Sequence, residues 1–146
     1  MPSGLSAYLQ NKTLDAIFRG QSLPTISAVY FALILDPSQG GNEVTGGGYT
    51  RASVATSLSN FCGTQGSGTT TASSGTSGQV SNNVNIVFPS PSAYWGLVDQ
   101  VWVYDSASGG NILAKGMLTS QKNINGSDPA PLFPPGAITF TFSNTP

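Results

Sequence analysis

The chain has 146 residues, of which only 8% are charged, and its formal net charge at pH 7 is −1. Five Lys and Arg residues in the whole chain cannot build a basic surface, which argues against a nucleic-acid partner. Histidine is absent, and with it the commonest general base and metal ligand, so we expect no enzyme, no cofactor and no metal site.

The length suits one domain, and 18 Gly and 10 Pro predict many turns and few long helices. The single cysteine, Cys62, cannot form an internal disulfide. Without a histidine to activate its thiol, a structural role is favoured over a catalytic one. No apolar run approaches the roughly 18 residues that span a bilayer, and no secretory signal is visible. We therefore expect no membrane partner and synthesis in a cytoplasm.

Residues 6–19 form the one good helix candidate. Ser3 or Ser6 can cap its start, and Gly20 is placed to end it. At 100° per residue the apolar side chains fall on two sides, one with Leu14, Ile17 and Phe18 near Ala7, the other with Leu5, Tyr8 and Leu9.

Two explanations of this pattern stay open. Either the first turn is not helical, or the helix lies between its own domain and a neighbouring subunit, which we favour. We accordingly divide the chain into an N-terminal helical arm, 1–22, and a β-sandwich domain, 23–146.

The first half of the β domain contains one long apolar run. Residues 27–35 predict a strand that is covered on both faces. In the stretch 43–54, the run Gly46-Gly47-Gly48 indicates a bulge or a close backbone approach. Residues 63–78 are Gly, Ser and Thr with little else, which predicts a flexible loop or a segment that orders only against a partner.

A β-hairpin at 94–118 is the centre of the second half, with its turn at 105–111. Strict alternation puts Leu97, Asp99, Val101 and Val103 on one face and Val98, Gln100, Trp102 and Tyr104 on the other. Both faces are largely apolar, which predicts a central position in the sheet.

The remaining elements are shorter. Strands are predicted at 84–88 and, more weakly, at 119–124, with a turn at Asn125-Gly126. Residues 128–135 hold four prolines and predict an extended loop, and 137–142 alternate as a half-buried strand. Six or seven strands and one N-terminal helix predict a mainly β fold, either an antiparallel β-sandwich or a small barrel.

Two groups of side chains are candidates for chemistry. Asp99 and Asp105 could in principle form a glycosidase pair, but Asp105 begins a turn, where Asp normally binds its own backbone. The aromatic residues Tyr94, Trp95, Trp102 and Tyr104 suit either a sugar platform or anchors of a core or subunit interface, and we favour the anchors.

Ion pairing is expected for Arg51 with Glu43 and for Arg19 with Asp15. Such pairs contribute roughly 0–1 kcal/mol when exposed and matter more when closed off at an interface. The candidates for subunit contacts are therefore Tyr8, Leu9, Phe18, Arg19, Arg51, Trp95 and Trp102.

Several motifs in order carry a resemblance to a known family. They include 8–20 (YLQNKTLDAIFRG), 43–51 (EVTGGGYTR), Trp95-Gly96, 105–113 (DSASGGNIL) and 135–139 (PGAIT). In this order and spacing the chain resembles a family of small structural proteins of tailed bacteriophages, labelled tail fibre or minor tail proteins. Capsid cement (decoration) proteins are the other placement. The chain departs from the family in the loops 63–78 and 128–135.

The resemblance implies a non-enzymatic virion component made in the host cytoplasm. Its expected partners are the major capsid protein or tail proteins, together with copies of itself, a trimer being the expected symmetry. Neither a membrane nor a nucleic acid is expected as a partner. The alternative that the resemblance leaves open is a receptor- or glycan-binding module of a tail fibre.

Overall fold

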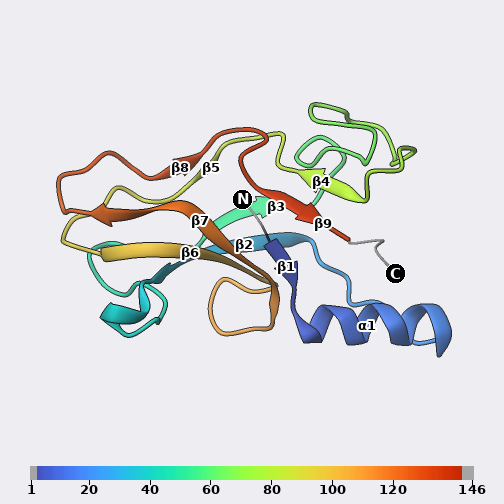
Figure 1. Cartoon of the computed structure of the whole chain (residues 1–146), viewed down its shortest axis with the longest axis horizontal. Helices are drawn as coiled ribbons and strands as arrows, with labels where there is room; N and C mark the ends of the chain where they lie inside the picture. The colour runs from blue at the N-terminus through green and yellow to red at the C-terminus, as the bar shows by residue number, and fades with distance from the viewer. Residues whose placement is uncertain (1–2, 143–146) are drawn as a thin grey trace.

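A five-stranded antiparallel sheet forms one layer of the molecule (Figure 1). The structure is a computed structural model and describes residues 3–142. Across the sheet the strands follow the order β1 (Ser3–Leu5), β7 (Ile112–Ile124), β6 (Gly96–Tyr104), β2 (Ala28–Leu35) and β3 (Ala52–Ala55).

Two small antiparallel sheets form the opposing layer. One pairs β4 (Gln79–Ser81) with β9 (Thr139–Thr141), and the other pairs β5 (Ile86–Val87) with β8 (Leu132–Phe133). The core lies between the layers. From the main sheet, Phe31, Leu33 and Val101 contribute to it, and these side chains pack in one cluster with Ile86, Phe88 and Ile138.

The mainly β, antiparallel fold with an N-terminal helix is confirmed. The barrel alternative is not, because the main sheet stays open, with β1 at one edge and β3 at the other. Several strands are only two or three residues long, and for this reason sequence pattern missed β1 and β4.

The helix predicted at 6–19 is α1 (Ala7–Phe18). Ser6 caps it by accepting a hydrogen bond from the Leu9 N–H, at 3.1 Å. Gly20 follows the C-cap residue Arg19 with φ +67°, a conformation that glycine adopts without strain. A single turn of 3₁₀ helix, η1 (Pro37–Gln39), is the other helical element of the described residues.

The central hairpin is confirmed, since β6 lies between β7 and β2 and pairs with both. The predicted faces of β6 are wrong at its start. The register shifts between Val98 and Gln100 against both neighbours, so a bulge turns Val98 inward to join Val101 and Val103 in the core. A strict period of two cannot continue across an inserted residue.

Strand β2 is covered on both faces, as its apolar run predicted. Phe31 and Leu33 point into the main core. Ala32 and Ile34, on the other face, pack with Tyr104, Trp102 and Tyr30 in a second, smaller cluster.

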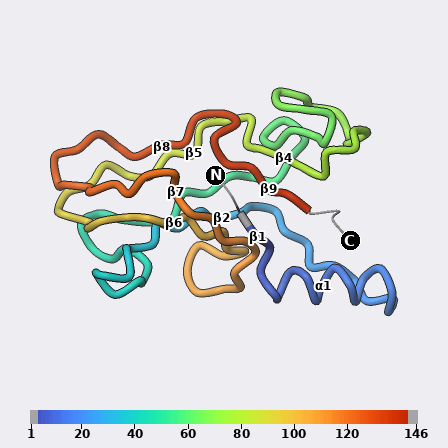
Figure 2. The backbone as a smooth tube through the Cα atoms, in the orientation of Figure 1, coloured from blue at the N-terminus to red at the C-terminus, as the bar shows by residue number. Residues whose placement is uncertain are grey.

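The connections also differ in part from expectation. The weak strand predicted at 119–124 is the end of the long β7, and the proline-rich loop 128–135 contains β8. The loop 63–78 is held by its own side chains, with Gln65 donating to Thr71 Oγ1 and Ser77 donating to the Thr64 carbonyl. Figure 2 shows this loop folded back on itself beside β4.

Candidate functional site: an apolar groove and an exposed helix face

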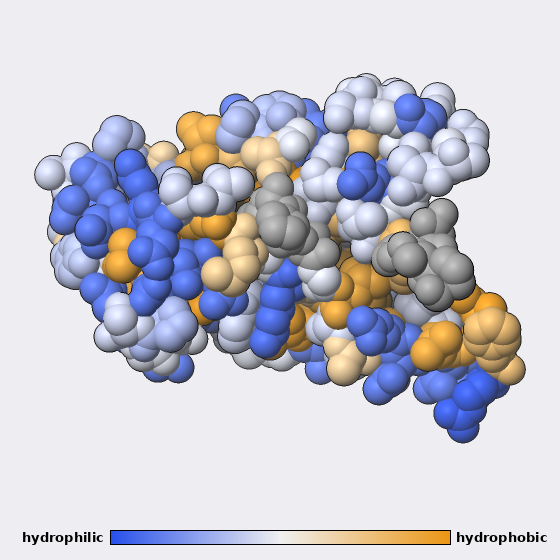
Figure 3. All heavy atoms as spheres, in the orientation of Figure 1, coloured by the Kyte–Doolittle hydropathy of each residue, from blue (hydrophilic) through white to orange (hydrophobic). Residues whose placement is uncertain are grey.

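The helix α1 has two apolar sides, and only one of them contacts the domain. Tyr8 and Leu9 pack against the main core together with Leu5 of β1. On the opposite side Leu14, Ile17 and Phe18 are 54%, 66% and 78% exposed. None of the twelve helical residues is fully buried. We call Leu14, Ile17 and Phe18 the outer helix face; Figure 3 shows hydrophobic side chains at the surface along α1.

Ser6 joins the start of the helix to the main sheet. Its backbone N–H donates to the Leu113 carbonyl at 2.8 Å, and its hydroxyl donates to the Ile112 carbonyl. The same hydroxyl oxygen caps the helix. Ser6 therefore fixes the residue at which α1 begins and also the point at which the chain stops running beside β7.

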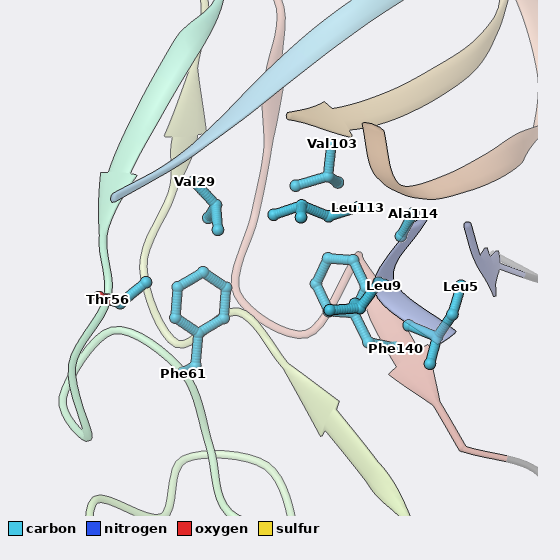
Figure 4. A pocket seen from close by; sticks show the side chains of 9 residues that line it. All are labelled: Leu5, Leu9, Val29, Thr56, Phe61, Val103, Leu113, Ala114 and Phe140. Carbon is cyan, nitrogen blue, oxygen red and sulfur yellow. The ribbon is translucent and has the colours of Figure 1, made fainter. Parts of the chain in front are cut away.

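An apolar groove lies at the base of α1, between the ends of β2, β6, β7 and β9. Its volume is about 220 Å³, and eight of its nine lining residues are apolar, Thr56 being the exception. Figure 4 shows the rings of Phe61 and Phe140 on two sides of the space and Val103 and Leu113 along a wall. The other lining residues are Leu5, Leu9, Val29 and Ala114.

Exposed apolar residues continue from the groove onto the surface. Phe140 lines the groove, and Phe142, two residues further along the same strand direction, is more than half exposed. Leu58 is exposed just beyond Thr56. The groove and the outer helix face are therefore neighbouring parts of one apolar end of the molecule.

A second constellation surrounds Arg51 on the opposite face of the main sheet. Arg51 makes two hydrogen bonds to the Glu43 carboxylate, Nε to Oε1 at 2.9 Å and Nη2 to Oε2 at 2.8 Å. Its Nη1 donates to the carbonyls of Ser106 and Gly109 at 2.8 and 2.9 Å. The guanidinium lies 3.6 Å from the ring centroid of Tyr104. Arg51 thus joins the 43–51 segment to the turn of the central hairpin.

Tyr49 completes this network. Its hydroxyl donates to Glu43 Oε1 at 2.9 Å and accepts from the Leu33 N–H at 3.0 Å. Burial chiefly, and the nearby Glu43 charge, raise the pKa of Tyr49 far above its ordinary value, so it remains a donor. Burial alone would raise the pKa of Glu43, but the hydrogen bonds from Arg51 and Tyr49 outweigh it and hold that pKa below its ordinary value.

Both predicted ion pairs are present, but their surroundings differ. The Arg51 side chain is only 6% exposed in its pair with Glu43, whereas Arg19 is 74% exposed in its pair with Asp15, at 2.9 Å. Only the first is shielded from solvent within a single chain.

The two tryptophans occupy different places. Trp95 is buried in the core, where its indole N–H donates to the Gly47 carbonyl at 2.8 Å, so it anchors its own domain and is not a surface for a partner. Trp102 is half-buried on the outer face of the sheet, with Lys115 Nζ 3.9 Å from its ring centroid and its N–H donating to Gln100.

The run of glycines before Arg51 is explained by Trp95. Gly47 has φ +57°, and a Cβ there would lie 2.9 Å from two atoms of the Trp95 indole ring. The close backbone approach predicted from the sequence is therefore present at Gly47.

The two aspartates considered as a glycosidase pair have different surroundings: Asp105 is hydrogen-bonded within its turn, and Asp99 is buried. Asp105 accepts hydrogen bonds from the backbone and side-chain nitrogens of Asn111, at 2.7 and 2.9 Å, as expected for a turn residue. Asp99 is 5% exposed, and its Oδ1 has no hydrogen-bond partner among residues 3–142. Burial chiefly, and the charge of Asp36, raise its pKa.

The thiol of Cys62 is buried. It accepts a hydrogen bond from the Ser81 N–H at 3.1 Å and lies 3.2 Å from the Ser81 hydroxyl. Within the part of the chain that the structure describes, no three His, Cys, Asp or Glu residues group as metal ligands would. No helix between residues 3 and 142 is both long and apolar enough to cross a membrane.

Comparison with known families gives a match that spans nearly the whole folded unit. The sequence profile of the Gp80 family, described as podophage GP4 fiber I protein gp80, matches residues 4–141. The chain belongs to this family. No curated protein matches the sequence.

Membership of the Gp80 family makes the chain a structural fibre protein of a bacteriophage particle, and the predicted resemblance to phage tail-fibre proteins is confirmed. The matched residues, 4–141, include α1, the groove and the Arg51 network.

Sequence reasoning found part of the apolar end of this Gp80-family protein. It placed Tyr8, Leu9 and Phe18 among the contact candidates, but it gave no sign of the groove. The groove residues come from six separate elements and from the stretch that follows β3, so they share no local sequence pattern. The sequence signal that points toward it is the pair of apolar sides on α1.

Proposed function

We propose that the protein is a non-enzymatic, homo-oligomeric component of a phage tail fibre. The observation that carries this proposal is the match to a fibre-protein family over residues 4–141. The family description names a fibre and no capsid protein, which favours the tail over the capsid cement role.

The physical character of the surface supports repeated protein contacts. Only 8% of the residues are charged, so neighbouring subunits can bury polar and apolar surface with little desolvation of charge. The exposed outer helix face gives such contacts an apolar centre. We infer that the partners are copies of the chain and other tail proteins, and that assembly follows synthesis in the host cytoplasm.

Localisation on the intact particle tests this function. A labelled copy of the protein is visualised by electron microscopy on purified phage, and particles that lack the protein are compared for tail appendages and infectivity. We expect label at the tail and particles without a fibre part. Label spread over the capsid, or complete and infectious tails without the protein, would contradict the tail role.

Receptor or glycan binding is the alternative, and its support is narrower. Among the four candidate aromatics, Trp95 is buried and the Trp102 ring is covered by Lys115, while Tyr94 is more than half exposed. Binding to host cells or a glycan array that is lost in Tyr94→Ala or Trp102→Ala, with the fold intact, would favour this alternative. No binding at micromolar protein concentration would remove it.

A further inference from the structure

We propose that the outer helix face of one copy docks into the apolar groove of the next copy, with Phe18 as the inserted side chain. This inference rests on the proposed homo-oligomeric fibre role and specifies the contact that would build it. Each chain supplies one helix face, formed by Leu14, Ile17 and Phe18, and one groove.

The groove cannot be filled by the chain's own Phe18. Leu9 lines the groove, and Phe18 follows nine residues later in the same helix. A rise of 1.5 Å per residue puts them about 14 Å apart along the helix axis, and the outer face points away from the domain. The Phe18 side chain that enters the groove in this proposal therefore belongs to another copy.

The dimensions suit an aromatic side chain. An apolar protein cavity of about 150 Å³ can hold a benzene molecule, and the groove measures about 220 Å³. Insertion would surround Phe18 with Phe61, Phe140 and Leu113. An insertion of this kind is the arrangement typical of a side chain that dominates an interface.

The exposed apolar side chains supply much of the apolar area that a specific interface contains. Leu14, Ile17 and Phe18 are exposed on the helix, and Leu23, Leu58 and Phe142 are exposed close to the arm or the groove. Counted over the two partners of one contact, they offer roughly 600 Å² of apolar side-chain surface. A standard interface buries ~1,600 Å² in total, about 57% of it apolar, so these side chains supply about two-thirds of the apolar area that such an interface contains.

Charge presents no barrier to this contact. Among residues 3–142, none with a charged side chain lines the groove. On the helix, Asp15 pairs with Arg19 at 2.9 Å, and Lys12 Nζ lies 5.9 Å from the Tyr8 ring centroid on the domain side. Docking therefore buries no unpaired charge at its centre.

Packing against a partner would stabilise the helix α1. Isolated helices shorter than about 12–15 residues are marginally stable in water, and packing of an apolar face supplies most of their stability. Here the twelve residues of α1 contact the domain mainly through Tyr8 and Leu9, near the first turn. A second copy is the occupant that this chain always has available, and a contact of helix to groove closes into a ring when the rotation between copies allows.

Sedimentation of the purified full chain gives the first test. We expect the wild type to be an oligomer, Phe18→Ser to raise its dissociation constant at least ~10-fold, about 1.4 kcal/mol, and the matched surface variant Leu132→Ser to leave it unchanged. Leu132 is also about half exposed but lies on β8, away from the helix and the groove. Circular dichroism checks that both variants keep the fold, which their exposed positions allow.

Disulfide cross-linking distinguishes the geometry. The double variant Ile17→Cys with Thr56→Cys, which keeps Phe18, should cross-link between copies under mild oxidation, whereas Ile17→Cys alone should not. The wild type is the blank, because its Cys62 is buried.

Each outcome decides a separate question. A monomeric wild type at high concentration overturns both this contact and the homo-oligomeric role. An oligomer unaffected by Phe18→Ser, or a double variant that does not cross-link, overturns only the contact. Dimers of Ile17→Cys alone would show helices packed on helices and also overturn it.

Discussion

Replacing Arg51 by alanine is expected to be one of the most destabilising single changes outside the core. The substitution removes two hydrogen bonds to Glu43, two to the carbonyls of the hairpin turn and the contact with the Tyr104 ring. It also leaves the Glu43 carboxylate, which is largely shielded from solvent, without its cation.

The magnitude follows from the burial of the pair. Breaking a buried ion pair by removing one partner costs about 3–5 kcal/mol, and the partial exposure of Glu43 places the expected loss near the lower limit, about 3 kcal/mol. For a chain of this length the thermal midpoint should fall by about 6–12 °C. Arg51→Lys keeps the charge but not the planar two-nitrogen contact, so we expect roughly half of that loss.

Equilibrium unfolding in urea at pH 7 measures these losses, with circular dichroism as the readout. The matched control is Arg19→Ala, which breaks the exposed pair with Asp15 and should cost at most about 0.5 kcal/mol. The reasoning is refuted if Arg51→Ala and Arg19→Ala destabilise equally, or if Arg51→Ala loses less than about 1 kcal/mol.

Three further predictions concern single residues. The pKa of Glu43 is lower in the folded protein than in the unfolded chain. Its contribution to stability is therefore present above the unfolded pKa of about 4.3 and is lost as pH falls through the folded value. The difference in unfolding free energy between wild type and Arg51→Ala, measured in urea, should shrink below about pH 4. The pKa of Asp99 is raised in the folded protein, so its ionisation destabilises the fold as pH rises above about 4. Asp99→Asn should raise the thermal midpoint at pH 7 and have little effect at pH 3. An equal gain at pH 7 and pH 3 would contradict the raised pKa. Gly47→Ala should cost about 1 kcal/mol or more beyond Gly109→Ala, because both glycines have nearly the same φ, +57° and +58°, but only at Gly47 does a Cβ meet the Trp95 ring; equal losses in thermal scans would remove that explanation.

The elements that sequence predicts well here are the long ones. The apolar run of β2, the hairpin of β6 and β7, and the capped helix α1 each carry a local pattern that is sufficient to identify them. The pairings of Arg51 with Glu43 and Arg19 with Asp15 were also predictable, because the charges are few and close in sequence.

The parts that sequence did not predict depend on contacts between distant segments. β1 and β4 are three residues long and exist because β7 and β9 lie beside them. The bulge at Asp99 moves Val98 to the core, and no local signal marks that insertion. The groove likewise forms only where six elements meet, so its residues have no common pattern.

The way α1 is tied to the sheet determines how a pull on the helix would be resisted. One end of α1 continues into β1, an edge strand held to β7 by three residue pairs, Ser3 to Leu5. The other end leads to β2, which is bonded on one side to β3 and on the other to β6. Tension applied to α1 would therefore separate β1 from β7 first. The connection to β2 would hold until the pairing of β2 with β3 and β6 is broken.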